Sequence, residues 1–228
     1  MKISVLMPVY NENRTIEDIL ELVRGVKFEK EIILVDDCSN DGTRDLLKEQ
    51  FGDGKEEVKV FYHQENGGKG AAIRTALEKA TGDYVIVQDA DMEYSPHDML
   101  KLAECVEKTG AEAVYGSRFL KTWKSTSLLH FMVNKFLTTL TNVFFGSSLT
   151  DMETCYKMIK TDVMRDLDIR SSRFEMEPEI TAKLLKKGYV IREVPVSYCG
   201  RSYDEGKKIG WRDGVEALWT IFKYRFFE

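Results

Sequence analysis

The first half of the chain alternates short apolar segments rich in β-branched residues with segments whose apolar residues recur at helical spacing. Strands are predicted at residues 3–9, 31–35, 58–62, 84–88 and 113–116, and helices at 15–26, 43–50, 71–80 and 95–108. A strand followed repeatedly by a helix implies parallel pairing with right-handed crossovers. The sequence therefore predicts an α/β fold in which helices flank a mostly parallel central sheet.

The pattern changes after about residue 118. Residues 123–145 predict a long helix with more apolar surface than a single buried face needs. A strand within 149–159, a helix to residue 187, a strand at 190–198 and a final amphipathic helix follow. A chain of 228 residues with 43% hydrophobic content, without repeats or a linker, fits one large domain, residues 1–228.

Composition excludes several classes of protein. A net charge of -5 disfavours a nucleic-acid-binding protein. The four cysteines include no C-x-x-C pair, and His63, His97 and His130 show no ligand spacing, so neither zinc nor a disulfide framework is predicted. The first apolar run is too short for a signal peptide, and no segment reaches the roughly 18 apolar residues of a membrane span. We expect a reducing, cytoplasmic location.

Acidic side chains follow the strand at residues 84–88. Asp89, Asp91 and Glu93 alternate along an extended segment, so all three can face one hard cation. Ligands of parallel sheets collect at the carboxyl ends of the strands. A polar exit from a strand would explain the same residues. Other strand ends add Tyr10, Glu12, Asp37 and Lys69.

An acidic cluster without histidine or cysteine suits Mg²⁺ or Mn²⁺, which proteins usually hold with one or two carboxylates and substrate phosphates. A diphosphate ligand is therefore expected. Arg118, Arg201, Lys207 and Lys208 lie in later loops, where they could contact the same anion or a second one. The glycines around Lys69 match neither a P-loop nor a dinucleotide fingerprint, so they are weak evidence alone.

Four motifs carry a resemblance to a known family. Residues 8–12 (PVYNE), 35–43 (VDDCSNDGT), 66–70 (NGGKG) and 89–91 (DAD) occur in the order found in family 2 glycosyltransferases of the GT-A fold. The chain resembles most the dolichol-phosphate, or polyprenyl-phosphate, mannosyltransferase branch, from residue 3 to about 208. The resemblance implies a Rossmann-like nucleotide-sugar-binding half, residues 1–118, and an acceptor-side and membrane-facing extension, residues 119–228.

The resemblance also implies roles for individual residues. Pro8, Tyr10, Glu12 and Asp37 match positions that hold the nucleoside of the donor. Asp89-Ala90-Asp91 matches the D-x-D motif, in which Asp91 is the direct ligand of the divalent ion. Glu93 replaces a glutamine often found there, and we expect it as a further ligand.

The later motifs concern the phosphates and the acceptor. Arg118 matches an arginine that faces the acceptor phosphate, whereas Arg201 and Lys207 or Lys208 resemble the basic residues that close over the donor phosphates. Residues 151–157 depart from the Asp-x-Thr-Gly-Phe-Arg type of sequence, which leaves the acceptor open.

The implied function is inverting, divalent-metal-dependent transfer of mannose or glucose from GDP-mannose or UDP-glucose to a polyprenyl phosphate. Residues 123–145 and 211–227 are the expected contacts with the cytoplasmic face of a membrane, although ordinary packing would also explain their apolar character. The lipid phosphate is already an anion and needs no general base.

Three alternatives remain: one within the family and two outside it. If the acceptor is a sugar hydroxyl in polysaccharide or glycolipid synthesis, a base is needed, and the resemblance implies Glu177, because hydroxyl-using relatives place an acidic pair here. Glu179 is then its neighbour, or it matches the glutamate of the lipid branch itself. Both carboxylates could instead only stabilise a helix start. A non-catalytic nucleotide-sugar-binding module would not need the acidic pair with the loop lysines. A nucleotidyltransferase would need a glycine-rich, arginine-bearing loop where this chain has PVYNE.

Overall fold

The computed structural model describes residues 1–51, 58–120, 128–201 and 210–228. Within these residues a seven-stranded sheet has the order β3-β2-β1-β4-β6-β5-β7. Its strands are β1 (Ile3–Val9), β2 (Lys30–Asp36), β3 (Val58–Tyr62), β4 (Tyr84–Val87), β5 (Ala113–Ser117), β6 (Lys157–Lys160) and β7 (Ile191–Pro195). Both halves of the chain contribute strands to this sheet.

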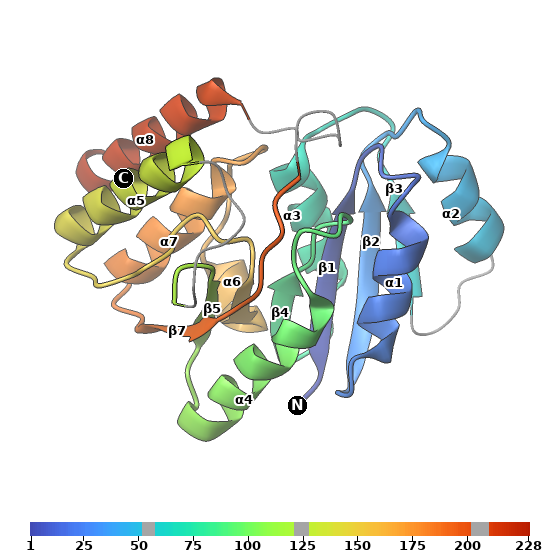
Figure 1. Cartoon of the computed structure of the whole chain (residues 1–228), viewed down its shortest axis with the longest axis horizontal. Helices are drawn as coiled ribbons and strands as arrows, with labels where there is room; N and C mark the ends of the chain where they lie inside the picture. The colour runs from blue at the N-terminus through green and yellow to red at the C-terminus, as the bar shows by residue number, and fades with distance from the viewer. Residues whose placement is uncertain (52–57, 121–127, 202–209) are drawn as a thin grey trace.

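Helices cover both faces of the sheet (Figure 1). They are α1 (Ile16–Gly25), α2 (Thr43–Phe51), α3 (Lys69–Lys79), α4 (Met99–Thr109), α5 (Leu128–Phe145), α6 (Thr161–Asp166), α7 (Met176–Lys186) and α8 (Trp211–Phe226), and the 3-10 helix η1 (Pro96–Asp98) precedes α4. Side chains alternate along a strand, so Val5 packs with α1, α2 and α4, whereas Leu6 packs with α3, α6 and α7. The predicted α/β fold with a mostly parallel sheet is confirmed.

One strand departs from the parallel arrangement. β6 pairs antiparallel with β4 on one side and with β5 on the other, whereas β5 and β7 are parallel. The sequence predicted a strand here but gave no sign of its direction. It also missed α6, because six residues are too few to show helical periodicity.

The last layer consists of α5 and α8, which lie side by side away from the sheet (Figure 1). Leu137 on α5 packs with Ala217 and Ile221 on α8 and with Met152. Other apolar side chains of the two helices, and that of Phe227 just after α8, remain exposed. We call them the α5/α8 apolar face: Met132, Val133, Phe136, Val143, Val215, Trp219, Phe222, Phe226 and Phe227. Residues 123–127 of the predicted helix lie outside the described residues.

No helix in the described part of the chain is both long enough and apolar enough to span a membrane.

The carboxyl ends of β1, β2 and β4 lie at one edge of the sheet because these strands are parallel. The turns after β1 and β2 are joined by hydrogen bonds. The Asn11 N–H donates to Ser39 Oγ at 2.9 Å, and the Asn40 N–H donates to Asn11 Oδ1 at 2.9 Å. Asn11 and Cys38 have positive φ angles of 52° and 64°, so both turns reverse sharply at this edge.

Candidate active site

Asp37, just after β2, holds the glycine turn that precedes α3. Its carboxylate accepts hydrogen bonds from the N–H groups of Gly67 at 2.9 Å and Gly68 at 2.7 Å, and His63 Nδ1 lies 2.7 Å from Oδ1. Gly68 has a φ of +89°, and a Cβ there would lie 2.4 Å from the Ser172 carbonyl oxygen. The turn therefore needs glycine, and Asp37 fixes where α3 begins.

Lys69, the first residue of α3, forms the centre of a buried ionic cluster. Its Nζ lies 2.7 Å from Oδ1 and 3.0 Å from Oδ2 of Asp89, and 3.7 Å from the Glu177 carboxylate. Burial opposes the charged form of Lys69, but the Asp89 carboxylate raises the pKa of this lysine above its ordinary value. In the same way burial opposes ionisation of Asp89, but Lys69 lowers its pKa.

Arg201 bridges the acids at the ends of β1 and β4. Its guanidinium lies 3.0 Å from Glu12 Oε2 and 2.7 Å from Asp91 Oδ2. The Arg201 backbone N–H donates to Glu93 Oε1 at 2.8 Å, and the Tyr198 hydroxyl donates to Glu93 Oε2 at 2.8 Å. The chain that leaves β7 therefore crosses the carboxyl ends of the first strands.

Burial raises the pKa of Asp91 to about 7; the charges of Asp89 and Glu93 add to this effect, and Arg201 opposes it. Such a concentration of carboxylate charge is what a bound cation relieves.

The three carboxylates predicted as metal ligands are not assembled around one point. Asp89 is directed to Lys69, whereas Asp91 and Glu93 contact Arg201. In the described residues no three histidine, cysteine, aspartate or glutamate side chains are grouped to hold a metal ion. The oxygen donors still fit a hard cation. Asp91 and Glu93 could hold Mg²⁺ or Mn²⁺ together with substrate phosphates.

Glu177, near the start of α7, lies between two lysines. Lys157 Nζ, which is 2% exposed, forms an ion pair with Glu177 Oε2 and donates to the Met152 carbonyl oxygen at 3.0 Å. Glu177 Oε1 is buried without a hydrogen-bond partner and faces Lys69. The structure therefore brings the predicted base Glu177 into the cluster of Lys69 and Asp89.

Glu179 lies elsewhere, because residues two apart on a helix point to nearly opposite sides. Its carboxylate accepts hydrogen bonds from Lys183 at 2.6 Å, the Tyr224 hydroxyl at 2.7 Å and the Ser171 N–H at 2.7 Å. Burial would raise the pKa of Glu179, but these hydrogen bonds lower it to about 2. The structure corrects the expectation that Glu179 neighbours Glu177 in the site; it joins α7 to α8.

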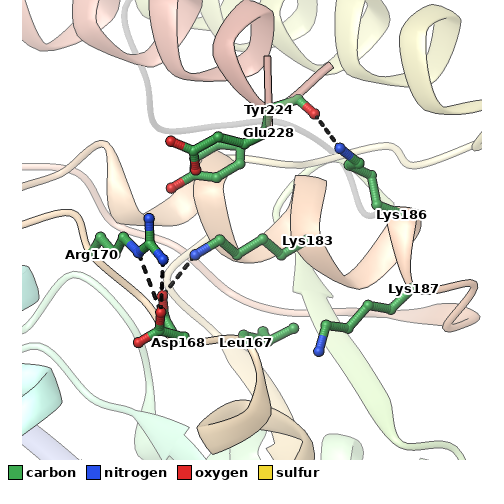
Figure 2. Close-up of a pocket in the computed structure, with 8 residues that line it drawn as sticks. All are labelled: Leu167, Asp168, Arg170, Lys183, Lys186, Lys187, Tyr224 and Glu228. Atoms are coloured by element: carbon green, nitrogen blue, oxygen red, sulfur yellow. Dashed lines mark hydrogen bonds and ion pairs between the residues drawn. The ribbon is translucent and has the colours of Figure 1, made fainter. Parts of the chain in front are cut away.

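A cavity of about 580 Å³ lies beside α7 and the end of α8, and none of its lining residues is a predicted site residue (Figure 2). Its basic side chains already have partners: Arg170 lies 3.2 Å from Asp168, Lys183 donates to the Asp168 carbonyl oxygen at 2.7 Å, and Lys186 donates to the Tyr224 carbonyl oxygen at 3.0 Å. The cavity is lined by Leu167, Asp168, Arg170, Lys183, Lys186, Lys187, Tyr224 and Glu228.

Arg118, just after β5, is fully engaged by one carboxylate. Its Nε and Nη2 donate to Asp151 at 2.7 Å and 2.8 Å, and its backbone N–H donates to the same group at 2.9 Å. The guanidinium also lies 5.1 Å from the centre of the Tyr198 ring. Its predicted role toward an acceptor phosphate therefore requires that the phosphate share this arginine with Asp151.

The remaining predicted residues have simpler settings. Pro8 pairs with Val35 within the sheet, and Tyr10 is half-buried after β1. Ala90 is buried, and its carbonyl oxygen accepts a hydrogen bond from Thr15 at 2.8 Å. Lys207 and Lys208 lie outside the described residues.

Sequence reasoning did not single out Asp151, Glu153 or Lys157. All three lie in the otherwise mostly apolar segment at residues 149–159, and charged residues at the entrance to a buried strand were the signal that could have identified them.

The family model described as "Glycosyl transferase family 2" matches residues 4–168. The chain belongs to glycosyl transferase family 2. This finding confirms the predicted glycosyltransferase. Lys69, Asp89 and Asp91 lie within the matched residues, whereas Glu177 and Arg201 come later in the chain. The cluster is therefore the candidate active site of this glycosyltransferase.

Two curated relatives extend the similarity along the chain. The low-salt glycan biosynthesis hexosyltransferase Agl6 of Haloferax volcanii is 28% identical over 92% of the chain, and the dolichol-phosphate mannosyltransferase of Pyrococcus furiosus is 28% identical over 98%. The glycosyltransferase spans 51% and 62% of the lengths of these two relatives.

Solved structures confirm the GT-A fold. The glucosyl-3-phosphoglycerate synthase of Mycobacterium tuberculosis, in complex with Mn²⁺, UDP and glucosyl-3-phosphoglycerate, superposes with a TM-score of 0.73. It is 17% identical, and the match covers 98% of this glycosyltransferase and 80% of that chain. At this identity the similarity concerns the fold.

Proposed function

We propose that the chain transfers a hexose, mannose or glucose, from a nucleoside-diphosphate sugar to a polyprenyl phosphate, with inversion and with help from a divalent cation. The observation that carries this proposal is the meeting of Asp89 and Asp91 with Lys69 and Arg201 at the carboxyl edge of a family 2 sheet. Such a donor site needs carboxylates that hold a cation and positively charged side chains that bind the diphosphate.

On the donor side, Pro8, Tyr10, Glu12 and Asp37 would bind the nucleoside, and Asp91 with Glu93 would hold Mg²⁺ or Mn²⁺. The cation, when bound, supplies neutralisation of the charge on the departing nucleoside diphosphate. Lys69 is kept protonated by Asp89 and adds positive charge at the same edge. Arg201, together with Lys207 and Lys208, would contact the diphosphate, which would draw Arg201 away from its present carboxylate partners.

On the acceptor side, the α5/α8 apolar face supports a lipid substrate. Trp219 is 61% exposed and Phe136 is 58% exposed, which is unusual for aromatic side chains unless a surface covers them. Lys223 and Arg225 on α8 provide basic residues of the kind that attract anionic lipid headgroups. We propose peripheral binding of this face at the cytoplasmic side of a membrane, where Arg118 would face the acceptor phosphate.

A sugar hydroxyl is the second candidate acceptor. The observation that favours it is Glu177, whose Oε1 is buried beside the donor cluster without a hydrogen-bond partner. A carboxylate in that position could accept the proton of a hydroxyl nucleophile.

The test is release of nucleoside diphosphate from a panel of nucleotide sugars, with Mg²⁺ or Mn²⁺, in the presence and absence of a short polyprenyl phosphate. Lipid-dependent release that Asp91→Ala abolishes, while the exposed Asp162→Ala leaves it intact, supports the leading function. Metal-dependent binding of a nucleotide sugar without lipid-stimulated release refutes the lipid acceptor and favours the hydroxyl. If no nucleotide sugar binds, the assignment of these residues to a donor site is wrong and the proposed function fails.

A further inference from the structure

The turn between α5 and β6 presents an acidic side chain, Glu153, from a rigid support. Lys157 Nζ donates to the carbonyl oxygens on both sides of Glu153, those of Met152 and Thr154. The Thr154 hydroxyl donates to the Gly116 carbonyl oxygen at 2.6 Å, which ties the turn to β5. The position of Glu153 is therefore fixed by buried hydrogen bonds that its own carboxylate does not make.

The Glu153 carboxylate is poorly satisfied within the described residues. Its Oε1 is buried without a hydrogen-bond partner, although part of the side chain reaches solvent. Glu193 supports the same turn and shows the contrast, because its oxygens accept from the N–H groups of Thr150 and Asp151 at 2.8 to 3.1 Å. An unsatisfied buried carboxylate oxygen destabilises a fold, so its presence on so rigid a turn calls for a ligand.

Glu153 lies next to the candidate active site. Lys157, which donates to the carbonyl oxygens on both sides of Glu153, forms an ion pair with Glu177, and Glu177 lies 3.7 Å from Lys69 of the donor cluster. Two residues farther along the chain, Cys155 donates a hydrogen bond to Asp89. The turn that carries Glu153 therefore lies beside Asp89, the acid that follows β4.

The charges around Glu153 decide what kind of group suits it. Two carboxylates, Glu177 and Asp151, act on it alongside the basic groups of Lys157 and Arg118, which already form ion pairs with those carboxylates. Burial raises the pKa of Glu153 to about 7, against the opposing effect of Lys157. A phosphate placed on this oxygen would add a further negative charge, whereas a neutral hydroxyl would donate the missing hydrogen bond.

We propose that Glu153 Oε1 accepts a hydrogen bond from a hydroxyl group of the bound substrates and so selects for that hydroxyl. The inference rests on the proposed glycosyl transfer, which brings a polyhydroxylated hexose to this edge of the sheet. The hydroxyl belongs to the transferred hexose or, with the second candidate acceptor, to the acceptor sugar, and the hydrogen bond is the same in either case.

The experiment uses the full chain with Glu153→Ala and Glu153→Gln. Binding of the nucleotide sugar and of the nucleoside diphosphate alone is measured by calorimetry, and acceptor-dependent turnover is measured with the same proteins. We expect Glu153→Ala to leave nucleoside diphosphate binding within twofold of the wild type. If the hydroxyl is on the hexose, nucleotide-sugar affinity falls by about tenfold. If the hydroxyl is on the acceptor, the affinity for the nucleotide sugar is unchanged, and turnover at a given acceptor concentration falls by about tenfold.

Structural damage has a different signature. Because Glu153→Gln removes a poorly satisfied charge, we expect it to melt at or above the wild-type temperature, whereas the control Glu193→Gln, which weakens the support of the turn, should melt lower without changing substrate preference. Equal loss of nucleoside diphosphate and nucleotide-sugar binding in Glu153→Gln would overturn the proposal, and so would wild-type binding and turnover in both variants. If the wild type itself binds no nucleotide sugar, the proposed function fails first, and the proposal for Glu153 fails with it.

Discussion

Arg201 occupies the place among the acids where a divalent cation is expected, so its removal should strengthen metal binding. The guanidinium lies 2.7 Å from Asp91 and 3.7 Å from Glu93, the two carboxylates proposed to hold the ion, and 3.0 Å from Glu12. A cation that binds Asp91 must displace these contacts. Arg201 therefore competes with the metal when no nucleotide is present.

The size of the effect follows from the contacts that are lost. A hydrogen bond between charged groups contributes about 1.5–3 kcal/mol, and the Arg201 side chain is only 17% exposed, so solvent weakens it modestly. If one such contact is displaced on metal binding, Arg201→Ala should bind Mg²⁺ or Mn²⁺ about 10- to 100-fold more tightly. Turnover should fall in the same variant, because the proposed contact with the diphosphate is lost.

Calorimetric titration of Mn²⁺ into the protein without nucleotide measures this directly, at pH 8, above the pKa of about 7 that Asp91 has with Arg201 in place. Because loss of Arg201 raises this pKa further, the comparison is repeated with Mg²⁺ at a higher pH. Arg201→Lys, which keeps the positive charge, should show a smaller gain, and Arg165→Ala on α6 should show none. Unchanged or weaker Mn²⁺ binding in Arg201→Ala would refute the competition and place the cation elsewhere.

Three further outcomes follow from the structure. The pKa of Glu31 is lowered from 4.5 to about 2 by hydrogen bonds from Lys59 and Ser4, with burial opposing the shift, so its stabilising effect is present above about pH 4.5 and is lost as the pH falls toward 2. Glu31→Gln should cost about 2 kcal/mol in urea unfolding at pH 7 and nothing at pH 2, and an equal loss at both pH values would contradict this linkage. Gly68→Ala should lower the melting temperature by several degrees, because its Cβ would lie 2.4 Å from a backbone oxygen; an unchanged melting temperature would show that the turn can shift. Replacing Phe136 and Trp219 with serine should reduce sedimentation with anionic vesicles while nucleotide binding is retained, and equal loss of both would indicate unfolding instead.

The sequence was most informative where local pattern and topology agree. Alternating strands and helices predicted the parallel part of the sheet, and the strand ends then placed Lys69, Asp89 and Asp91 at one carboxyl edge, because parallel strands share that edge. Lys69 contacts Asp89 there, whereas Asp91 contacts Arg201. The prediction of Glu177 as a member of the site came from the resemblance to family relatives that act on hydroxyl acceptors, not from the local pattern.

Other features depend on contacts between distant residues that no local pattern reveals. Arg118 pairs with Asp151, 33 positions away, and Arg201 pairs with Glu12, 189 positions away. The side to which Glu179 points depends on where α7 begins, and a shift of one residue would move it by about 100°. The sequence therefore identified the charged residues but not which charge each of them would meet.

The reversed direction of β6 affects how such a chain can diversify. Because β6 runs antiparallel to β4, it starts at the edge of the sheet where β4 ends. The turn before β6 therefore reaches the same edge as the acids after β4. That turn comes from the second half of the chain, and its substitution leaves the strands that carry the donor motifs untouched. Under the proposed function, substitutions in this turn would change acceptor preference while the strands that carry the nucleotide-binding motifs keep their sequence.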